Sequence, residues 1–185
     1  MIYRKTYESP FETIYLESDG NYLTGLWFRD SMDSKKRESE YKEENLPIFD
    51  QTINWLDIYF SGKNPGFIPQ YKINNLTPFR KQVIDIMNKI PYGKTITYND
   101  IAKEIAKKKG IDRMSAQAVG GAVGWNPICI IIPCHRVIGS NNSLVGYGGG
   151  IKNKIKLLEI EKNDMSKFIV PKKEQHYSIK SSIYI

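Results

Sequence analysis

The sequence predicts an α+β protein: a small N-terminal antiparallel β-sheet domain with one helix, followed by a mainly helical, winged-helix-like domain. Two strand-like segments, residues 11–16 and 22–28, flank an Asp-Gly turn, and three helical patterns follow between residues 77 and 124. The chain has 185 residues, of which 41% are hydrophobic, enough for a packed core. We therefore expect domains at residues 1–75 and 76–170 and a C-terminal tail at residues 171–185.

Charge and cysteine content narrow the function classes. The formal net charge of +7 suits a polyanionic partner such as nucleic acid, although a lysine-rich surface can equally serve solubility. No apolar stretch follows Met1 and no apolar run is long enough to span a membrane, so we expect a cytoplasmic protein without membrane contact. The two cysteines, Cys129 and Cys134, are too few for a zinc site and poorly spaced for a structural disulfide.

The N-terminal elements follow from local patterns. Segments 11–16 and 22–28 are rich in aromatic and β-branched residues, and residues 18–21 between them predict the tight turn of a β-hairpin. The charged residues 29–44 predict a loop. We expect Asp50 to cap a helix that runs to Phe60, and residues 67–73 to return as a strand. No residue in 1–75 carries recognisable chemistry, which predicts a scaffold role.

The next segment predicts three helices. Thr77 and Pro78 form a helix start, and the following apolar residues recur at spacings of four, three and four: Phe79, Val83, Ile86 and Ile90. Thr97 and Asp100 have the spacing of a capping box, which opens a second helix ending at Gly110. Ser115 opens a third, residues 116–124, made almost wholly of small residues. This helix-turn-helix pattern allows close approach either to DNA or to another helix in the core.

Cys134 is the candidate nucleophile. Residues 130–132 are three isoleucines, which predict a short buried strand that ends at Pro133 and presents Cys134. A thiol reacts as the thiolate, and the adjacent His135 is the obvious proton acceptor, because the other histidine, His176, lies in the tail. Neighbours on a strand point to opposite faces, so cooperation requires a turn or a bridging water. A structural cysteine beside an ordinary histidine is the alternative.

Two features follow the cysteine. The glycine-rich residues 146–150 can fold closely around a ligand, and they lack the lysine of a phosphate-binding P-loop. A last helix begins near Ile151, and Glu161 lies on its buried face, three residues past Leu158. That carboxylate is either a solvated boundary residue or the partner of a buried group. Residues 165–185 look like a tail that is partly disordered.

Three sequence strings point to one family: residues 120–127 (GGAVGWNP), residues 130–139 (IIIPCHRVIG) and residues 145–150 (VGYGGG). They resemble the O6-alkylguanine-DNA alkyltransferases, whose signature is Pro-Cys-His-Arg-Val after an Asn-Pro, and the likeness extends over residues 76–161. The resemblance implies a DNA repair protein that irreversibly transfers a methyl or other alkyl group from O6-alkylguanine to Cys134. O4-alkylthymine is left open as a second substrate. The resemblance also implies no cofactor and no metal, minor-groove binding of double-stranded DNA with a flipped base, and a monomer.

The resemblance also implies roles for individual residues. Cys134 is the alkyl acceptor, His135 relays its proton through water, and Glu161 orients that histidine. Tyr98 assists base rotation and guanine departure, and Asn126 joins the recognition helix to the cysteine segment. Arg136 is implied to be structural. The remaining implied positions contact DNA or line the pocket: Gln117, Ala118, Gly121, Val137, Val145, Tyr147 and Gly148. Arg113 lies about one helical turn before Gln117, and we expect it to contribute to DNA binding as partial compensation for the arginine that many relatives have in place of Gln117.

Two positions depart from the family pattern. Gln117 stands where many relatives have an arginine that fills the gap left by the flipped base, so we expect weaker DNA affinity. Cys129 stands where some relatives have a proline, and a smaller residue should admit bulkier alkyl groups. The main alternative function is a non-catalytic alkyltransferase-like protein that binds alkylated DNA, but such proteins replace the cysteine. A helix-turn-helix regulator and a thiol hydrolase are further alternatives.

Overall fold

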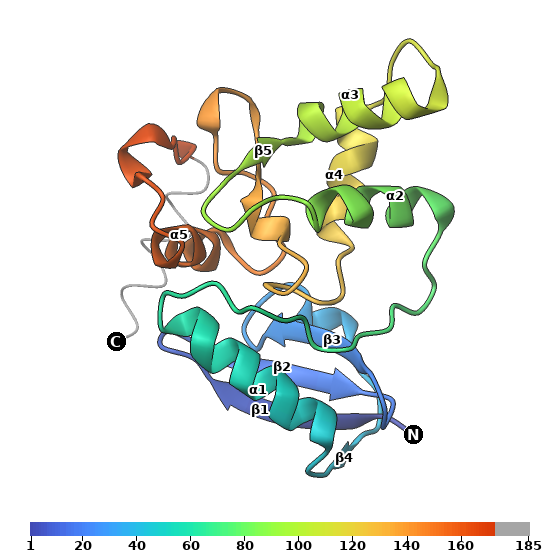
Figure 1. Cartoon of the computed structure of the whole chain (residues 1–185), viewed down its shortest axis with the longest axis vertical. Coiled ribbons are helices and arrows are strands. Elements are labelled where there is room, and N and C mark those ends of the chain that lie inside the picture. Colours follow the sequence, from blue (N-terminus) through green and yellow to red (C-terminus); the bar gives the residue numbers. More distant parts are fainter. Residues whose placement is uncertain (173–185) are drawn as a thin grey trace.

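A computed structural model describes residues 1–172 of the chain. Its N-terminal unit is a four-stranded sheet in the order β3-β2-β1-β4. The strands are β1 (Tyr3–Glu8), β2 (Thr13–Ser18), β3 (Leu23–Phe28) and β4 (Lys42–Glu43). The helix α1 (Pro47–Phe60) lies across this sheet, as Figure 1 shows. The predicted hairpin is confirmed as β2–β3, whose turn is closed by backbone N–H groups that donate to the Asp19 carboxylate.

Three details of this unit differ from the prediction. The strand β1 was missed because its mixture of charged and aromatic residues leaves it half-exposed, and β4 pairs with it in parallel. The helix α1 begins at Pro47 after the N-cap Leu46, so the prediction of Asp50 as cap is wrong; a proline at the first position already has a helical φ. Residues 67–73 form no strand, only an isolated bridge between Tyr71 and Leu23.

The helical unit follows the predicted order: α2 (Pro78–Met87), α3 (Tyr98–Lys109), α4 (Ala116–Gly124) and α5 (Ile151–Ile160). Thr77 and Ser115 each accept a backbone N–H at the start of a helix, and both bonds of the Thr97 capping box are present. Two short strands, β5 (Ile96–Thr97) and β6 (Val137–Ile138), pair in parallel beside α3. Figure 1 shows α2, α3 and α4 grouped at the end of the molecule away from α1.

The segment before Cys134 is not the predicted strand. Only Ile128 makes a bridge, to Leu26 of β3, and the chain then turns. Ile130 is buried at φ 69°, a backbone conformation that is rare for a β-branched residue. Asn126 holds this turn from inside, because its amide donates to the Ile132 carbonyl and its oxygen accepts the N–H of Ile128. The isoleucines were misread because their apolar run reflects burial in a turn.

The two units share one hydrophobic core. The Leu26 N–H donates to the carbonyl of Pro127 at 2.9 Å, and the Cys129 N–H donates to the carbonyl of Leu26 at 3.0 Å. The sheet therefore extends directly into the turn that precedes Cys134. The exact boundary between residues 75 and 76 stays a prediction.

The C-terminal segment packs further than expected. Met165, Phe168 and Val170 lie against a small buried cluster, and Ile169 bridges to Ser143, so the chain is packed as far as residue 170. Short 3-10 turns occur at Ser34–Lys36, Cys134–Arg136, Ser140–Asn142 and Met165–Lys167. Most of the predicted tail, with His176, lies outside the described residues. Within residues 1–172, no helix combines the length and apolarity needed to cross a bilayer.

Candidate active site

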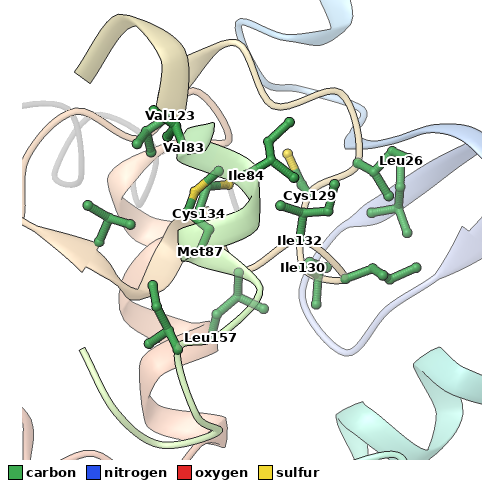
Figure 2. Close-up of a cluster of buried hydrophobic side chains, with 14 of the residues drawn as sticks. Leu26, Val83, Ile84, Met87, Val123, Cys129, Ile130, Ile132, Cys134 and Leu157 are labelled. Atoms are coloured by element: carbon green, nitrogen blue, oxygen red, sulfur yellow. The ribbon is translucent and has the colours of Figure 1, made fainter. Parts of the chain in front are cut away.

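Cys134 begins the 3-10 turn Cys134–Arg136 and is only 5% exposed. Figure 2 shows it deep in the core, with Val83 and Met87 of α2, Val123 of α4 and Leu157 of α5 around it. Within this 3-10 turn, Cys134 and His135 are not consecutive residues of an extended strand, where their side chains would point to opposite faces. Helices from both sides therefore fix the sulfur in an apolar setting.

A small cavity of about 10 Å³ reaches this sulfur. That volume is enough for about one water molecule and too small for a purine. Nine residues line it: Asp33, Val123, Gly124, Asn126, Cys129, Cys134, Gly146, Tyr147 and Gly148. A much larger hollow lies along α4 and shares the wall formed by Gly146, Tyr147 and Gly148. The sulfur is thus separated from an open surface by the glycine-rich segment.

His135 is bound by the carboxylate of Glu161, the residue that the family resemblance implies as its partner. Its Nε2 lies 2.7 Å from Oε1 of Glu161, and both side chains are fully buried. The ionised carboxylate accepts hydrogen bonds only, so we assign the proton to Nε2. Among residues 1–172, Nδ1 has no hydrogen-bond partner, which leaves it as a free acceptor. Burial lowers the pKa of His135 despite the nearby Glu161, so the ring is neutral near pH 7 and can accept a proton.

Glu161 is the centre of a buried polar network. Besides His135, it accepts hydrogen bonds from the Arg136 guanidinium at 2.8 and 2.9 Å, from the Tyr59 hydroxyl at 3.0 Å and from the Gly93 N–H at 3.2 Å. Burial raises the pKa of Glu161, but His135 and Arg136 outweigh it and lower the pKa to about 2. Arg136 also donates to the carbonyl of Ile90, so it links the carboxylate to the chain that follows α2.

Several groups act on the charge of Cys134. The neighbouring Cys129 thiol lowers the pKa of Cys134, whereas burial raises it. The amide of Asn126 and the ammonium of Lys154 also favour the thiolate, while the carboxylate of Asp33 opposes it. The balance places the pKa of Cys134 below its ordinary value. A cysteine of this kind is poised for nucleophilic attack.

Tyr98, at the start of α3, faces the same region. Its hydroxyl donates to the carbonyl of Val145 at 3.2 Å and lies close to Gly146, where an added Cβ would approach it to 3.1 Å. Burial and the nearby Cys134 raise the pKa of Tyr98, so it keeps its proton at neutral pH. It is thus a neutral donor at the edge of the glycine-rich segment.

The small residues of α4 divide into two faces. Val119, Ala122 and Val123 are buried, as a contact with the neighbouring helices requires. Gln117, Ala118 and Gly121 are exposed, and a Cβ added at Gly121 would meet nothing within 4 Å. One face of α4 therefore serves the contact with neighbouring helices, while the exposed face remains open to a partner. Core packing and close approach to DNA thus involve different faces of the same helix. Arg113 is exposed in the loop before this helix.

The structure distributes the remaining predicted residues around the site. Asn126, Cys129, Tyr147 and Gly148 line the cavity together with Cys134. Val137 and Val145 are not among its lining residues; instead, their carbonyls accept hydrogen bonds from Lys154.

Three residues of the site were not found from the sequence. Tyr59 and Asp33 come from the N-terminal unit, which was read as a scaffold, and no local pattern distinguishes them. Lys154 could have been noticed, because it lies three residues after Ile151 and four before Leu158, on the apolar face of α5. No cluster of three or more metal-binding side chains is found in the part of the chain that the structure describes.

Comparison with known proteins identifies the family. The DNA-binding domain model of 6-O-methylguanine DNA methyltransferase matches residues 78–163, and the model of its ribonuclease-like domain matches residues 2–67. A methylated-DNA-protein-cysteine methyltransferase of Mycobacterium leprae is 36% identical over 165 residues, or 89% of this chain and 95% of that protein. This chain belongs to the 6-O-methylguanine DNA methyltransferase family.

Further members of the methyltransferase family agree in sequence and fold. A relative from Methanosarcina barkeri is 39% identical and covers 89% of this chain and 99% of its own. The crystal structure of Mycobacterium tuberculosis OGT in complex with DNA matches with a TM-score of 0.73 at 35% identity, over 90% of this chain and 94% of that one. A methyltransferase structure from Methanococcus jannaschii matches with a TM-score of 0.59 at 30% identity, over 87% and 95%. The predicted family and α+β fold class are confirmed.

Proposed function

We propose that this chain repairs double-stranded DNA by moving a methyl or larger alkyl group from O6 of guanine to the sulfur of Cys134, once per molecule. The chain belongs to a family of DNA repair methyltransferases, whose curated members are named for transfer to a protein cysteine. One observation carries the assignment of the acceptor. Cys134 lines a cavity and is followed by His135, whose Nε2 is bound to Glu161 and whose Nδ1 is free within residues 1–172.

The proposed chemistry begins with loss of the thiol proton. A water molecule passes this proton from Cys134 to Nδ1 of His135, while Glu161 stabilises the resulting imidazolium through Nε2–H. The thiolate then attacks the alkyl carbon, so that the sulfur–carbon bond forms as the carbon–O6 bond breaks. The guanine leaves with the electron pair of the broken bond, and Tyr98 donates a hydrogen bond or proton to it.

The proposed DNA contact is the exposed face of α4. Gln117, Ala118 and Gly121 present little side-chain bulk, which suits close approach to a minor groove, and Arg113 adds positive charge beside them. A flipped base would enter from the hollow along α4. Because the cavity at Cys134 is too small for a purine, the segment carrying Tyr147 and Gly148 has to move away, together with Asp33, whose carboxylate lies against Gly148.

The same residues support a monomeric protein in a reducing compartment. All groups of the proposed site come from one chain, so a monomer suffices for the reaction. Cys129 and Cys134 are both free thiols, which fits a reducing compartment such as the cytoplasm.

Intact-mass analysis tests the proposal. The protein is incubated with duplex DNA containing one O6-methylguanine, and separately with the same duplex containing guanine. We expect a gain of one methyl group only with the methylated duplex, and peptide mapping should place it on Cys134 and not on Cys129. Binding of the methylated duplex without any mass gain would instead favour a non-catalytic alkylated-DNA-binding protein.

We expect Gln117→Arg to bind DNA more tightly than the natural protein. The added guanidinium supplies a charge and a stacking plane at the base-flipping face of α4, so affinity should rise several-fold and the salt slope should steepen by about one. Fluorescence anisotropy at several salt concentrations measures both quantities. Gln51→Arg on the exposed side of α1 adds the same net charge elsewhere. Equal gains in the two variants would mean that net charge, and not position, is responsible.

We expect the protein to accept benzyl as well as methyl groups. Cys129 lines the cavity beside Cys134, and its small side chain leaves room for a bulky alkyl group once the pocket opens. In Cys129→Val the added bulk should lower the rate of benzyl transfer about tenfold relative to methyl transfer. Competition between the two modified guanines in one reaction gives the ratio directly. A strict methyl preference in the natural protein would contradict this reading of Cys129.

A further inference from the structure

Lys154 is a fully buried lysine at the centre of the helical unit. It lies on the inner face of α5, and its side chain is among the largest with no exposed surface. Its Nζ donates to the carbonyl of Val137 at 2.6 Å and to the carbonyl of Val145 at 3.2 Å. Those two residues flank the segment that runs from the end of the Cys134 turn to the glycine-rich wall of the cavity.

This lysine has no carboxylate partner within residues 1–172. The ammonium contacts neutral groups: it donates to the two carbonyls, and it lies over the rings of Tyr98 and Tyr147 at 6.0 and 5.8 Å from their centroids. A buried ammonium without an anion is costly, so such groups are retained where an opposite charge is nearby. The acidic group that acts on Lys154 electrostatically is Cys134.

We propose that Lys154 is the buried counter-charge of the Cys134 thiolate and thereby a positioning residue of the transfer reaction. The inference rests on the proposed function, because it takes Cys134 as the acceptor. Lys154 holds residues 137–145 through the carbonyls of Val137 and Val145, and it supplies a full positive charge that favours the ionised sulfur. The other groups that favour the thiolate, Cys129 and Asn126, carry no full positive charge.

The surroundings of both partners are consistent with this pairing. Cys134 also faces the carboxylate of Asp33 from the N-terminal unit, which opposes the thiolate, and the hydroxyls of Tyr98 and Tyr147, whose pKa values are raised. Burial lowers the pKa of His135, and the charge of Lys154 also helps to keep that histidine neutral. Burial lowers the pKa of Lys154 to about 8 although Cys134 raises it, so the ammonium form predominates near pH 7.

Alkylation removes the negative charge of Cys134, which is the partner of the Lys154 ammonium. The thioether that forms on Cys134 is neutral, so the ammonium of Lys154 keeps only carbonyls and ring faces around it. Its pKa must therefore fall, because by linkage each charged form stabilises the other. In the spent protein, Lys154 therefore gives up its proton more readily than before the transfer.

The direct test is titration of Cys134 by NMR of protein labelled with ¹³Cβ-cysteine, with the signal assigned by its loss in Cys134→Ala. We expect the Cys134 midpoint in Lys154→Met to rise by about one pH unit or more, which is a tenfold loss of thiolate at neutral pH. Lys152→Met, on the exposed side of the same helix, should titrate like the natural protein. The same Cys134 midpoint in Lys154→Met and the natural protein would overturn the proposal.

A reciprocal measurement does not depend on the folding of Lys154→Met. In protein labelled with ¹³Cε-lysine, the Lys154 midpoint should be lower in Cys134→Ala than in the natural protein. An unchanged midpoint would refute the pairing. Neither titration uses DNA, so their failure would leave the proposed repair function standing. Conversely, absence of alkyl transfer would remove that function without changing either midpoint.

Discussion

Replacing Cys134 by alanine should abolish alkyl transfer while preserving the fold and DNA binding. The substitution removes the only proposed acceptor atom, so no alkylated protein should be detectable by mass after prolonged incubation with methylated duplex DNA. Cys134 is enclosed by apolar residues of α2, α4 and α5, and loss of one sulfur should cost only about 1 kcal/mol of unfolding free energy. The exposed face of α4 is unaffected, so anisotropy should report unchanged affinity.

Cys129→Ala is the matched control, because it removes a thiol from the same cavity. It should still be alkylated, at a reduced rate, since the Cys129 thiol lowers the pKa of Cys134. Alkylation of Cys129 in the Cys134→Ala variant would show that either sulfur can accept the group. That result would contradict the assignment of Cys134 as the sole acceptor.

Glu161→Gln should impair both stability and transfer. Glu161 is 2% exposed and accepts charged hydrogen bonds from Arg136, so its neutralisation leaves a buried guanidinium without a counter-ion. Breaking such a pair costs about 3–5 kcal/mol of unfolding free energy. The variant also loses the anion that stabilises protonated His135, which should slow transfer about 100-fold. Glu159→Gln, on the exposed side of α5, is the control and should change neither quantity by much.

The stability difference should depend on pH in a defined direction. The pKa of Glu161 is lowered in the folded state to about 2 from 4.5, so its contribution is complete above about pH 5 and disappears as the pH falls towards 2. Denaturant unfolding of the natural protein and Glu161→Gln between pH 7 and pH 2.5 measures this convergence. A constant difference across that range would show that the destabilisation comes from packing and not from the charge.

Local patterns in the sequence were sufficient to predict the helices that begin at a capping residue. The caps at Thr77, Thr97 and Ser115 form because side-chain oxygens satisfy backbone N–H groups within three residues, which is information the sequence carries locally. The pairing of Glu161 with His135 was also foreseen, from its place on the buried face of α5 and from the family resemblance.

The failures at the site share a physical cause, which is dependence on distant parts of the chain. The turn at residues 129–132 exists because Asn126 and Leu26 satisfy its backbone groups, and a run of isoleucines does not encode those partners. Tyr59 reaches Glu161 across 102 positions of sequence, and Asp33 reaches Cys129 across 96. Side chains that meet only after tertiary packing leave no periodic signal in the sequence.

The pairing of Leu26 with Pro127 and Cys129 has a consequence for the independence of the two halves. If residues 76–172 were excised as a fragment, the chain ahead of the acceptor would lose its backbone partners, and Glu161 would lose the hydroxyl of Tyr59. The N-terminal unit therefore stabilises the turn that precedes Cys134. Substitutions that destabilise the sheet should therefore also destabilise the turn at Cys134, as expected of a protein that unfolds in one cooperative step.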